Sequence, residues 1–440
     1  DAGQVTPQRL MDLSLDRLAR YDEALSTVVT LADRRGRLEA QAATGRNEPL
    51  SGIPFGAKDL FDSAGVRTLW GAHPYRERPL PKRDATALER LKNAGACLAA
   101  KLSTGELAVG DVWFGEPQRE DGTPLRPREG ARGRKTRNPW NPETGASGSS
   151  AGPAAAVAAG LVPFALGTET GGSIVSPAST CGVTGLRPTY GRVSRAGVMT
   201  LRWTLDKVGV LARSVSDCAR VLAAIHGPDG LDRSVSSAPF SWQSPGKAAR
   251  LRLGIVEREL FPQGNGADAD ARKAATLTKP VFEAAIDVFR REGWDIVPVT
   301  LPPFPAAALY AIHNAEAGAM FDEITRSGAI DFLEGQGPND RSSQLRASRF
   351  IPAVDYLRAQ RVRNSMIAAV EALFESVDLF LAPPSSDSVN MTNLTGHPAV
   401  VLPAGFVRGE SGPEMPQNIM LTGRLDDEAT LLDAGFVFER

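Results

Sequence analysis

Apolar runs alternate with amphipathic stretches along the N-terminal part of the chain. Thr6-Pro7 precedes leucines at helical spacing, and a helix is therefore predicted to open there. A second helix is predicted over residues 84–93, with Gly95 as its stop, and an apolar strand over 96–102 follows it. This part of the chain therefore predicts a helix followed directly by a buried strand.

The same alternation returns in the C-terminal half. A strand is predicted over residues 251–256, and an amphipathic helix ended by Gly293 leads into a strand over 294–299. The longest helical pattern, 355–375, precedes a strand over 379–382. Alternating helices and short apolar strands predict an α/β layered fold, which we take to be a single domain over residues 1–440.

Two segments interrupt this pattern. Residues 115–137 combine prolines and glycines with many basic residues, diluted by acidic ones, and are predicted to be a surface insertion. An anion-binding or gating loop is the alternative interpretation of this insertion. Residues 227–246 are polar and are predicted to be a linker-like segment between two halves of the domain.

Composition narrows the possible function classes. Lys and Arg number 50 against 51 Asp and Glu, so no net charge favours nucleic acid or an anionic membrane. No apolar run approaches the roughly 18 residues that span a bilayer. The chain has 3 cysteines and 4 histidines without metal-ligand spacing. We therefore expect no metal site, no cofactor, no membrane span and a reducing, cytoplasmic compartment.

The most unusual composition lies at residues 145–173, which read GASGSSAGPAAAVAAGLVPFALGTETGGS. Glycine inside a helix costs roughly 1 kcal/mol relative to alanine, so this clustering indicates unusual backbone angles or a close approach to a ligand. Consecutive N–H groups at Gly171, Gly172 and Ser173 have the pattern that an oxyanion hole requires.

Generic motifs offer competing nucleophiles and bases. Residues 148–152 match G-x-S-x-G with Ser150 as nucleophile, but 138–147 contain no apolar run, so the required preceding strand is not predicted. A phosphate loop would need a Gly-Lys-Ser/Thr ending, which the tract lacks. Ser244 and Lys247 match S-x-x-K within what reads as a surface turn.

The base that would activate a serine can be a histidine or a lysine. Among the histidines, His397 lies in an apolar-flanked loop and is the best candidate for a Ser-His-Asp triad. Lys58 ends the apolar segment GIPFGAK, where its ammonium group would be poorly solvated. Burial lowers the pKa of a lysine, so Lys58 is a candidate base near neutral pH.

Three blocks in this order closely resemble the amidase signature family: GIPFGAKDLF, SGSSAGPAAAVAAG and GTETGGSIVSPAS. The segments CGVTGLRPTYGRVSRAGVM, TLDKVGVLARSVSDCA and FLAPP…TNLTGHPAVVLPAGF extend the resemblance over most of the chain. The resemblance implies a large central mixed β-sheet covered on both faces by helices.

The resemblance also implies a Ser–Ser–Lys triad. Matched by motif position, Lys58 is the base, Ser149 is the relay serine that follows a cis peptide bond, and Ser173 is the nucleophile. The backbone N–H groups of Thr170, Gly171, Gly172 and Ser173 would receive the oxyanion. Ser150 would support the site by hydrogen bonding.

The chain departs from the family pattern at several positions. Glu169 stands where many members have Asp, Val175 where they have Arg, and residues 151–153 read Ala-Gly-Pro in place of Gly-Gly-Ser. None of these changes removes a triad group, but the loss of an arginine would alter hydrogen bonding beside the nucleophile.

The expected function is hydrolysis of a carbon–nitrogen amide-type bond through a serine acyl-enzyme. The substrate would be a small amide, such as an aryl amide, or a carbamate (urethane), with water as co-substrate and a monomer or homodimer as the enzyme. The alternative is a subunit of an amidotransferase that releases ammonia from glutamine for a partner protein. A non-catalytic scaffold is a third possibility, against which the intact triad argues.

Overall fold

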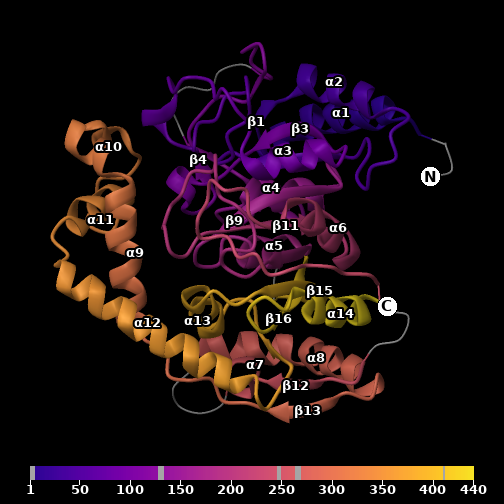
Figure 1. Ribbon diagram of the computed structural model, residues 1–440, viewed down its shortest axis with the longest axis vertical. Coiled ribbons are helices and arrows are strands. Elements are labelled where there is room, and N and C mark those ends of the chain that lie inside the picture. Colours follow the sequence, from indigo (N-terminus) through magenta and orange to yellow (C-terminus); the bar gives the residue numbers. More distant parts are fainter. Residues whose placement is uncertain (1–4, 127–132, 245–248, 263–268, 410–411) are drawn as a thin grey trace.

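One large mixed sheet organises the molecule. The computed structural model describes residues 5–126, 133–244, 249–262, 269–409 and 412–440. Within these ranges twelve strands form a continuous sheet in the order β13-β12-β14-β16-β15-β10-β11-β9-β2-β3-β1-β5. Parallel and antiparallel neighbours both occur, for example β2 beside β3 and β9 beside β11. The sheet runs through the whole molecule (Figure 1).

The strands of this sheet are β1 (Val28–Leu31), β2 (Pro54–Lys58), β3 (Cys97–Leu102), β5 (Gln118–Arg119), β9 (Phe164–Glu169), β10 (Thr184–Arg187), β11 (Lys207–Ala212), β12 (Arg252–Ile255), β13 (Asp295–Pro298), β14 (Leu379–Ala382), β15 (Ala399–Arg408) and β16 (Glu414–Thr422). Two small sheets pair β4 (Val112–Trp113) with β6 (Arg134–Lys135) and β7 (Arg137–Asn138) with β8 (Asn141–Gly145).

Helices cover both faces because the strand side chains alternate between two apolar cores. In β9, Ala165 belongs to one core, whereas Phe164 and Leu166 belong to the other. The first core contains residues of α1 (Pro7–Leu25), α2 (Asp33–Ala43), α4 (Ala151–Ala158), α5 (Val175–Cys181), α9 (Ala306–Met320), α12 (Ala353–Leu373) and α13 (Asp387–Thr395). The second contains residues of α3 (Thr86–Asn93), α6 (Val215–Ile225), α7 (Glu257–Leu260), α8 (Ala269–Arg291) and α14 (Glu428–Glu439).

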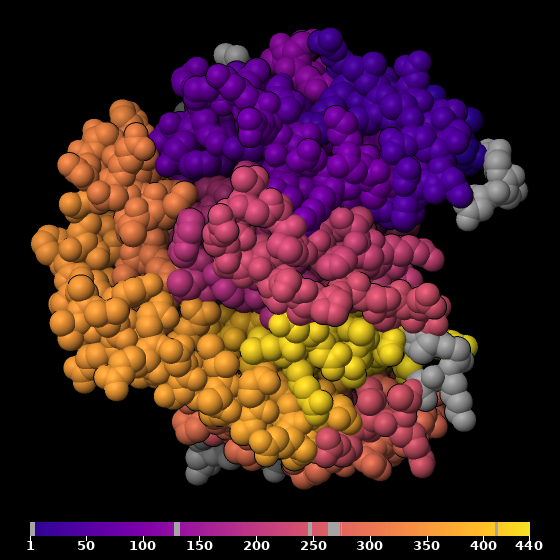
Figure 2. Space-filling view, in the orientation of Figure 1, coloured from indigo at the N-terminus to yellow at the C-terminus, as the bar shows by residue number. Residues whose placement is uncertain are grey.

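The helices α9 to α12 form one flank of the molecule, drawn in orange in Figures 1 and 2. This flank includes α10 (Asp322–Ser327) and α11 (Arg341–Ser348).

The short 3-10 helices are η1 (His73–Tyr75), η2 (Glu106–Ala108) and η3 (Ala329–Phe332). Among the described residues, none of the helices has the length and apolar composition needed to cross a membrane.

The elements expected from the hydrophobic pattern are confirmed, with small shifts at their ends. Thr6 caps α1 by accepting a hydrogen bond from the Arg9 amide. The predicted helix and strand at 84–102 are α3 and β3. The predicted C-terminal elements are β12, the second half of α8, β13, α12 and β14. The large mixed sheet with helices on both faces, which the resemblance implied, is likewise present.

The predicted insertion at 115–137 is tied to the N-terminal part of the fold. Its strand β5 extends the large sheet by pairing with β1. Arg119 pairs with Asp33 at 2.8 Å, and Arg126 pairs with the buried Asp22 at 2.7 Å. Residues 127–132, which include two of its arginines, lie outside the described ranges. The arginines at 119 and 126 therefore have carboxylate partners within the fold.

Residues 227–244, the described part of the predicted linker, contain no helix or strand. Asp229 nevertheless accepts a hydrogen bond from Thr86 at 2.6 Å, and Asp232 pairs with Arg195 at 2.9 Å. Trp242 donates to Asp433 on α14 at 2.7 Å. These contacts attach the segment to α3 and Arg195 near its start and to α14 near its end.

Candidate active site

Lys58 lies at the end of β2, on the face of the sheet that packs against α4. Its side chain is fully buried. Nζ lies 2.7 Å from Oγ of Ser149 and 2.9 Å from Oγ1 of Thr168, a residue of the neighbouring strand β9. Nζ also donates to the Thr168 carbonyl at 3.4 Å. Among the described residues Lys58 makes no ion pair, so its hydrogen-bond partners are all neutral groups.

Burial lowers the pKa of Lys58 to about 7, against the opposing charges of Asp206 and Glu169. The cause is desolvation, because a buried ammonium group loses its hydration without a carboxylate to replace it. Near neutral pH a large share of Lys58 is therefore the free amine, which can accept a proton.

Ser149 enters the site from the loop before α4. The peptide bond between Gly148 and Ser149 is cis, as the resemblance implied. Position 148 requires glycine, since a Cβ there would lie 2.0 Å from the carbonyl oxygen of Gly110. The same tight packing continues at Gly152, where a Cβ would lie 2.4 Å from the Ser103 amide. Gly148 lets the loop, and Gly152 the first turn of α4, pass close to the backbone of Gly110 and Ser103.

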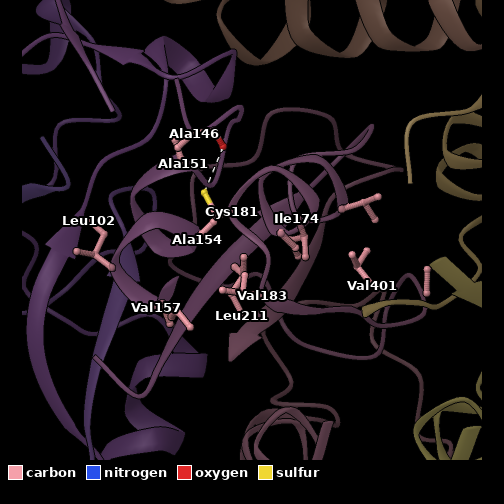
Figure 3. Close-up of a cluster of buried hydrophobic side chains, with 14 of the residues drawn as sticks. Leu102, Ala146, Ala151, Ala154, Val157, Ile174, Cys181, Val183, Leu211 and Val401 are labelled. Atoms are coloured by element: carbon pink, nitrogen blue, oxygen red, sulfur yellow. Dashed lines mark hydrogen bonds between the residues drawn. The ribbon is translucent and has the colours of Figure 1, made fainter. Parts of the chain in front are cut away.

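Small apolar side chains let α4 and α5, the helices that follow Ser149 and Ser173, lie close to the sheet. Figure 3 shows Ala151, Ala154 and Val157 of α4 in one cluster with Ile174 and Cys181. The alanine-rich part of the tract thus forms packed core, whereas its glycines and serines shape the loops beside it.

Ser150 connects the loop to its neighbours. Its fully buried hydroxyl donates to the Thr168 carbonyl at 3.1 Å and accepts from the Thr168 amide at 3.3 Å. Its amide donates to the carbonyl of Ser173 at 3.1 Å. A residue with these contacts holds the loop, β9 and the Ser173 segment together, and it is poorly placed to attack a substrate.

The segment 138–147 before these serines does hold a strand, contrary to the sequence-based prediction. Within the described ranges, β8 pairs only with β7, in a small hairpin. It pairs through backbone hydrogen bonds, which need no apolar run. Because β8 lies outside the large sheet, it does not supply the strand that a nucleophile elbow requires.

The segment Gly171–Ser173 presents unused backbone donors. In the described part of the chain, the N–H groups of Gly171, Gly172 and Ser173 donate to no protein acceptor. Gly172 has φ of 104°, a conformation that favours glycine. Gly171 is exposed, Gly172 is buried and Ser173 is half-buried, so the segment reaches the surface at Gly171. The hydroxyl of Thr170 is anchored on Asp206 at 2.5 Å.

The Glu169 carboxylate fixes the backbone directly after Ser173, a role that the sequence analysis did not predict. One carboxylate oxygen accepts the amides of Ile174 and Val175 at 2.6 and 2.8 Å. The other accepts from Arg187 at 2.8 Å and from Asn393 at 2.6 Å. Burial alone would raise the pKa of Glu169, but the Arg187 guanidinium and these donors hold it below its usual range.

Val175, which stands where many family members have arginine, is buried in the first core. The cation that neutralises Glu169 comes instead from Arg187 on β10. The five residues of this network lie on β9, at the start of α5, on β10 and on α13, and Asn393 is 224 positions from Glu169. All of these residues lie within the motif blocks quoted above, but the blocks do not show that the others hydrogen-bond to Glu169.

The histidine alternative finds no support in the geometry. His397 is fully buried, with Nδ1 2.7 Å from Oγ1 of Thr395 and Nε2 2.7 Å from a carboxylate oxygen of Glu371. Both ring nitrogens are therefore occupied by groups other than the serines. Ser244 is exposed in a loop, and its S-x-x-K partner Lys247 lies outside the described residues.

A second feature that sequence reasoning missed is His313 on α9. A Cβ built on Gly171 would lie 3.3 Å from Cε1 of His313, so the imidazole lies beside the start of the donor segment. Burial lowers the pKa of His313 to about 2, helped by the positive charges of Arg202, Lys207 and Arg341. The imidazole is therefore neutral at physiological pH.

A largely apolar cavity of about 760 Å³ lies along α9. Its walls come from α9, the start of α12 and the loop at 200–203, and include Trp203, Ala315, Met320 and Tyr356. Lys58, Ser149, Ser150 and Ser173 do not line it. It is therefore a compartment next to α9, the helix that also carries His313.

Comparisons with known proteins place this geometry in context. A family model described as Amidase matches residues 9–388. The glutamyl-tRNA(Gln) amidotransferase subunit from Roseiflexus sp. (strain RS-1) is 35% identical over 490 residues, with 100% of this chain and 93% of that protein covered. The corresponding subunit of Geobacter metallireducens is 34% identical, with 97% and 92% covered.

Solved structures of similar fold include enzymes of different substrates. The peptide amidase of Stenotrophomonas maltophilia has a TM-score of 0.78 and 26% identity, with 100% of this chain and 94% of that chain covered. A structure described as a vestigial protein complex that reveals the origins of an s-triazine catabolic enzyme has a TM-score of 0.82 and 28% identity, with 100% and 96% covered. Because the family match spans most of its length, the chain belongs to the amidase family, whose enzymes act on amide C–N bonds.

Proposed function

We propose that this protein hydrolyses an amide bond through a serine acyl-enzyme, with Ser173 as nucleophile, Ser149 as proton relay and Lys58 as base. The observation that carries the proposal is the 2.7 Å contact between Nζ of Lys58 and Oγ of Ser149, made by a lysine whose pKa is about 7. A permanently charged lysine could not accept the proton that the nucleophile loses.

In the acylation step, Oγ of Ser173 attacks the carbonyl carbon and gives its proton to Ser149, whose own proton passes to Lys58. The tetrahedral oxyanion accepts hydrogen bonds from the N–H groups of Gly171, Gly172 and Ser173. Each such donor is typically worth about 3–4 kcal/mol in the transition state. The C–N bond then breaks, and the nitrogen leaves with the proton returned through Ser149.

Water completes the cycle by the same route. It loses a proton to Lys58 through Ser149 as its oxygen attacks the acyl carbon. Ser173 then leaves the carbon and regains its proton, which frees a carboxylic acid. Ser150 and Glu169 take no part in these transfers; we assign them the positioning of the Ser173 segment.

A fluorophosphonate probe followed by peptide mapping tests the nucleophile. We expect labelling at Ser173 and its loss in Ser173→Ala, with the melting temperature nearly unchanged. A parallel panel of an aryl amide, an ester and a carbamate tests the bond that is cut. Labelling at Ser150, or turnover by Ser173→Ala equal to wild type, would overturn the proposal.

A second candidate function is the release of ammonia from glutamine within an amidotransferase complex. It is favoured by the curated relatives, because those of Roseiflexus and Geobacter are glutamyl-tRNA(Gln) amidotransferase subunits matching nearly the whole chain at 34–35% identity. This support is stronger than any that the comparisons give to an aryl amide or a carbamate substrate. The same acyl-enzyme chemistry would apply, with glutamine as the amide.

Ammonia release and co-purification separate the two candidates. A free-standing amidase would purify as a monomer or homodimer and cleave small amides without other proteins. An amidotransferase subunit would co-purify with partner subunits from its native host, and its glutaminase rate would rise when they bind. Glutamine turnover that depends on such a partner would favour the second candidate over the first.

A further inference from the structure

Arg341, the first residue of α11, carries buried donors without a protein partner. The residue is only 9% exposed, yet its Nε and Nη2 have no hydrogen-bond acceptor among the described residues. Its guanidinium carbon lies 5.9 Å from the centre of the Phe321 ring, which supports one face of the group. A buried donor without an acceptor is costly, so this site points to an acceptor that the protein itself does not supply.

The two free nitrogens lie on the same edge of the guanidinium group. Nε–H and Nη2–H point in parallel, and this edge matches the two oxygens of a carboxylate. Since no group within the described ranges occupies either nitrogen, the whole edge is available for a bidentate ligand.

The free edge belongs to the surroundings of the Gly171 segment. Helix α11, which begins at Arg341, packs against α9, the helix that carries His313, and the charges of Arg341 and Arg202 both lower the pKa of this ring beside Gly171. Nε2 of His313 is also buried without a partner among the described residues. Arg202 is held on this side by its Nε, which donates to the His313 carbonyl at 3.1 Å. The free nitrogens of Arg341 and His313 therefore lie on the α9 side of the segment that we assign to the oxyanion.

Asp206 and Glu316, the acidic residues whose charges act on Arg202, accept hydrogen bonds from neutral donors. Asp206 accepts from the hydroxyl of Thr170 and from the amides of Leu201 and Arg202. Glu316 accepts from Thr204, Tyr356 and Gln360.

Glu106 is the remaining acid whose charge acts on Arg341. Burial raises its pKa to about 7, and both of its oxygens face the Glu334 amide, at 3.2 and 3.3 Å. In the part of the chain that the structure describes, no carboxylate forms an ion pair with Arg341. The guanidinium edge thus lacks an internal counter-ion.

We propose that Arg341, together with Arg202 and His313, binds a carboxylate group of the substrate beside the Gly171–Ser173 segment. The inference rests on the proposed amidase function and adds its substrate class: amides that carry a carboxylate a few bonds from the scissile carbonyl. Arg341 supplies two parallel N–H donors, Arg202 supplies positive charge, and the neutral His313 supplies Nε2 as a further donor.

The test compares two primary amides of similar shape, succinamate and 4-methylpentanamide, in which an isopropyl group replaces the carboxylate. We expect wild-type kcat/KM to favour succinamate by at least about tenfold, as one charge-assisted interaction would give. Arg341→Gln should reduce this ratio by a similar factor, and Arg341→Lys should restore part of it. Arg349→Gln, an exposed arginine just after the same helix that pairs with Asp322, is the matched control and should keep the wild-type ratio.

Equal wild-type kcat/KM for the two amides, or the same ratio in wild type and Arg341→Gln, would overturn the subsite. Melting temperatures of the variants show whether each one is folded. If Arg341→Gln does not fold, Arg341→Lys and His313→Asn provide the comparison.

Calorimetric titration with succinate separates failure of the subsite from failure of the proposed function. If Ser173 is not labelled and no amide is cleaved, the catalytic proposal fails. Succinate binding that weakens at least tenfold in Arg341→Gln would still support the subsite. Succinate binding that is absent, or equal in both proteins, would overturn it.

Discussion

Two fully buried lysines lie on neighbouring strands of the sheet and meet different surroundings. Lys101 on β3 pairs with the equally buried Asp59 at 3.0 Å and donates to Thr68 at 2.7 Å. Lys58 on β2 has no carboxylate partner among the described residues and contacts the hydroxyls of Ser149 and Thr168. Burial lowers the pKa of both, but the Asp59 carboxylate opposes this effect directly at Lys101.

The difference separates a structural lysine from a lysine that can do chemistry. An ion pair in the core fixes a charge, and breaking it leaves the other charge without compensation. A lysine among hydroxyls can gain and lose a proton near pH 7 without disturbing such a pair. Position in the core is therefore a poor guide to function, whereas the identity of the polar neighbours discriminates well.

The largest expected effect is on catalysis at Lys58. Lys58→Met removes the proposed base, and kcat should fall by about 10³–10⁴-fold, at the upper end of what general-base catalysis contributes. The folded state should persist, because methionine fills a similar volume and removes a desolvated amine. Steady-state kinetics and a thermal melt check both statements; a variant that retains a tenth of wild-type kcat would contradict the role.

The matching change at Lys101 should act on stability instead. Lys101→Met leaves Asp59 buried and unpaired, so the free energy of unfolding should fall by about 3–5 kcal/mol. The kcat of the protein that remains folded should stay within a few-fold of wild type. Denaturant titration measures the loss.

The double variant Asp59→Asn/Lys101→Met sharpens this result, since removing both charges should recover part of the lost stability. A Lys101→Met protein as stable as wild type, but without activity, would reverse the roles of the two lysines.

The smallest expected effect concerns the hydroxyl beside Lys58. Thr168→Val removes the 2.9 Å contact to Nζ and keeps the shape of the side chain. Loss of one hydrogen bond of about 1 kcal/mol should lower kcat by about fivefold. Since that contact favours the charged lysine, the pKa of Lys58 should also move further down. A pH profile of the variant unchanged from wild type would show that Thr168 does not tune the lysine.

Sequence reasoning located the elements with strong hydrophobic patterns. β3, β14 and α12 follow from apolar runs and helical spacing, which are local properties. The motif blocks likewise directed attention to Lys58, Ser149 and Ser173. The long, partly exposed strands β15 and β16 were not predicted, because much of their stabilisation comes from pairing with each other rather than from a continuous apolar run.

The surroundings of the site could not be predicted in the same way. Glu169 contacts Asn393 across more than 200 positions, and His313 lies beside Gly171 across more than 100. Contacts of this kind depend on how the strands are ordered in the sheet, which no local pattern encodes. The free edge of Arg341 is equally invisible in the sequence, because it is defined by the acceptors that are missing around it among the described residues.

The pH dependence of kcat/KM, measured on an amide that the enzyme cleaves, tests the central claim most directly. Because the neutral form of Lys58 is the proposed base and its pKa is about 7, kcat/KM should reach a plateau above pH 7. Below that pH it should fall by about tenfold per pH unit as the lysine becomes charged. Lys58→Arg, which stays charged, should be inactive throughout this range. A profile that stays flat down to pH 5, or an active Lys58→Arg enzyme, would contradict the account.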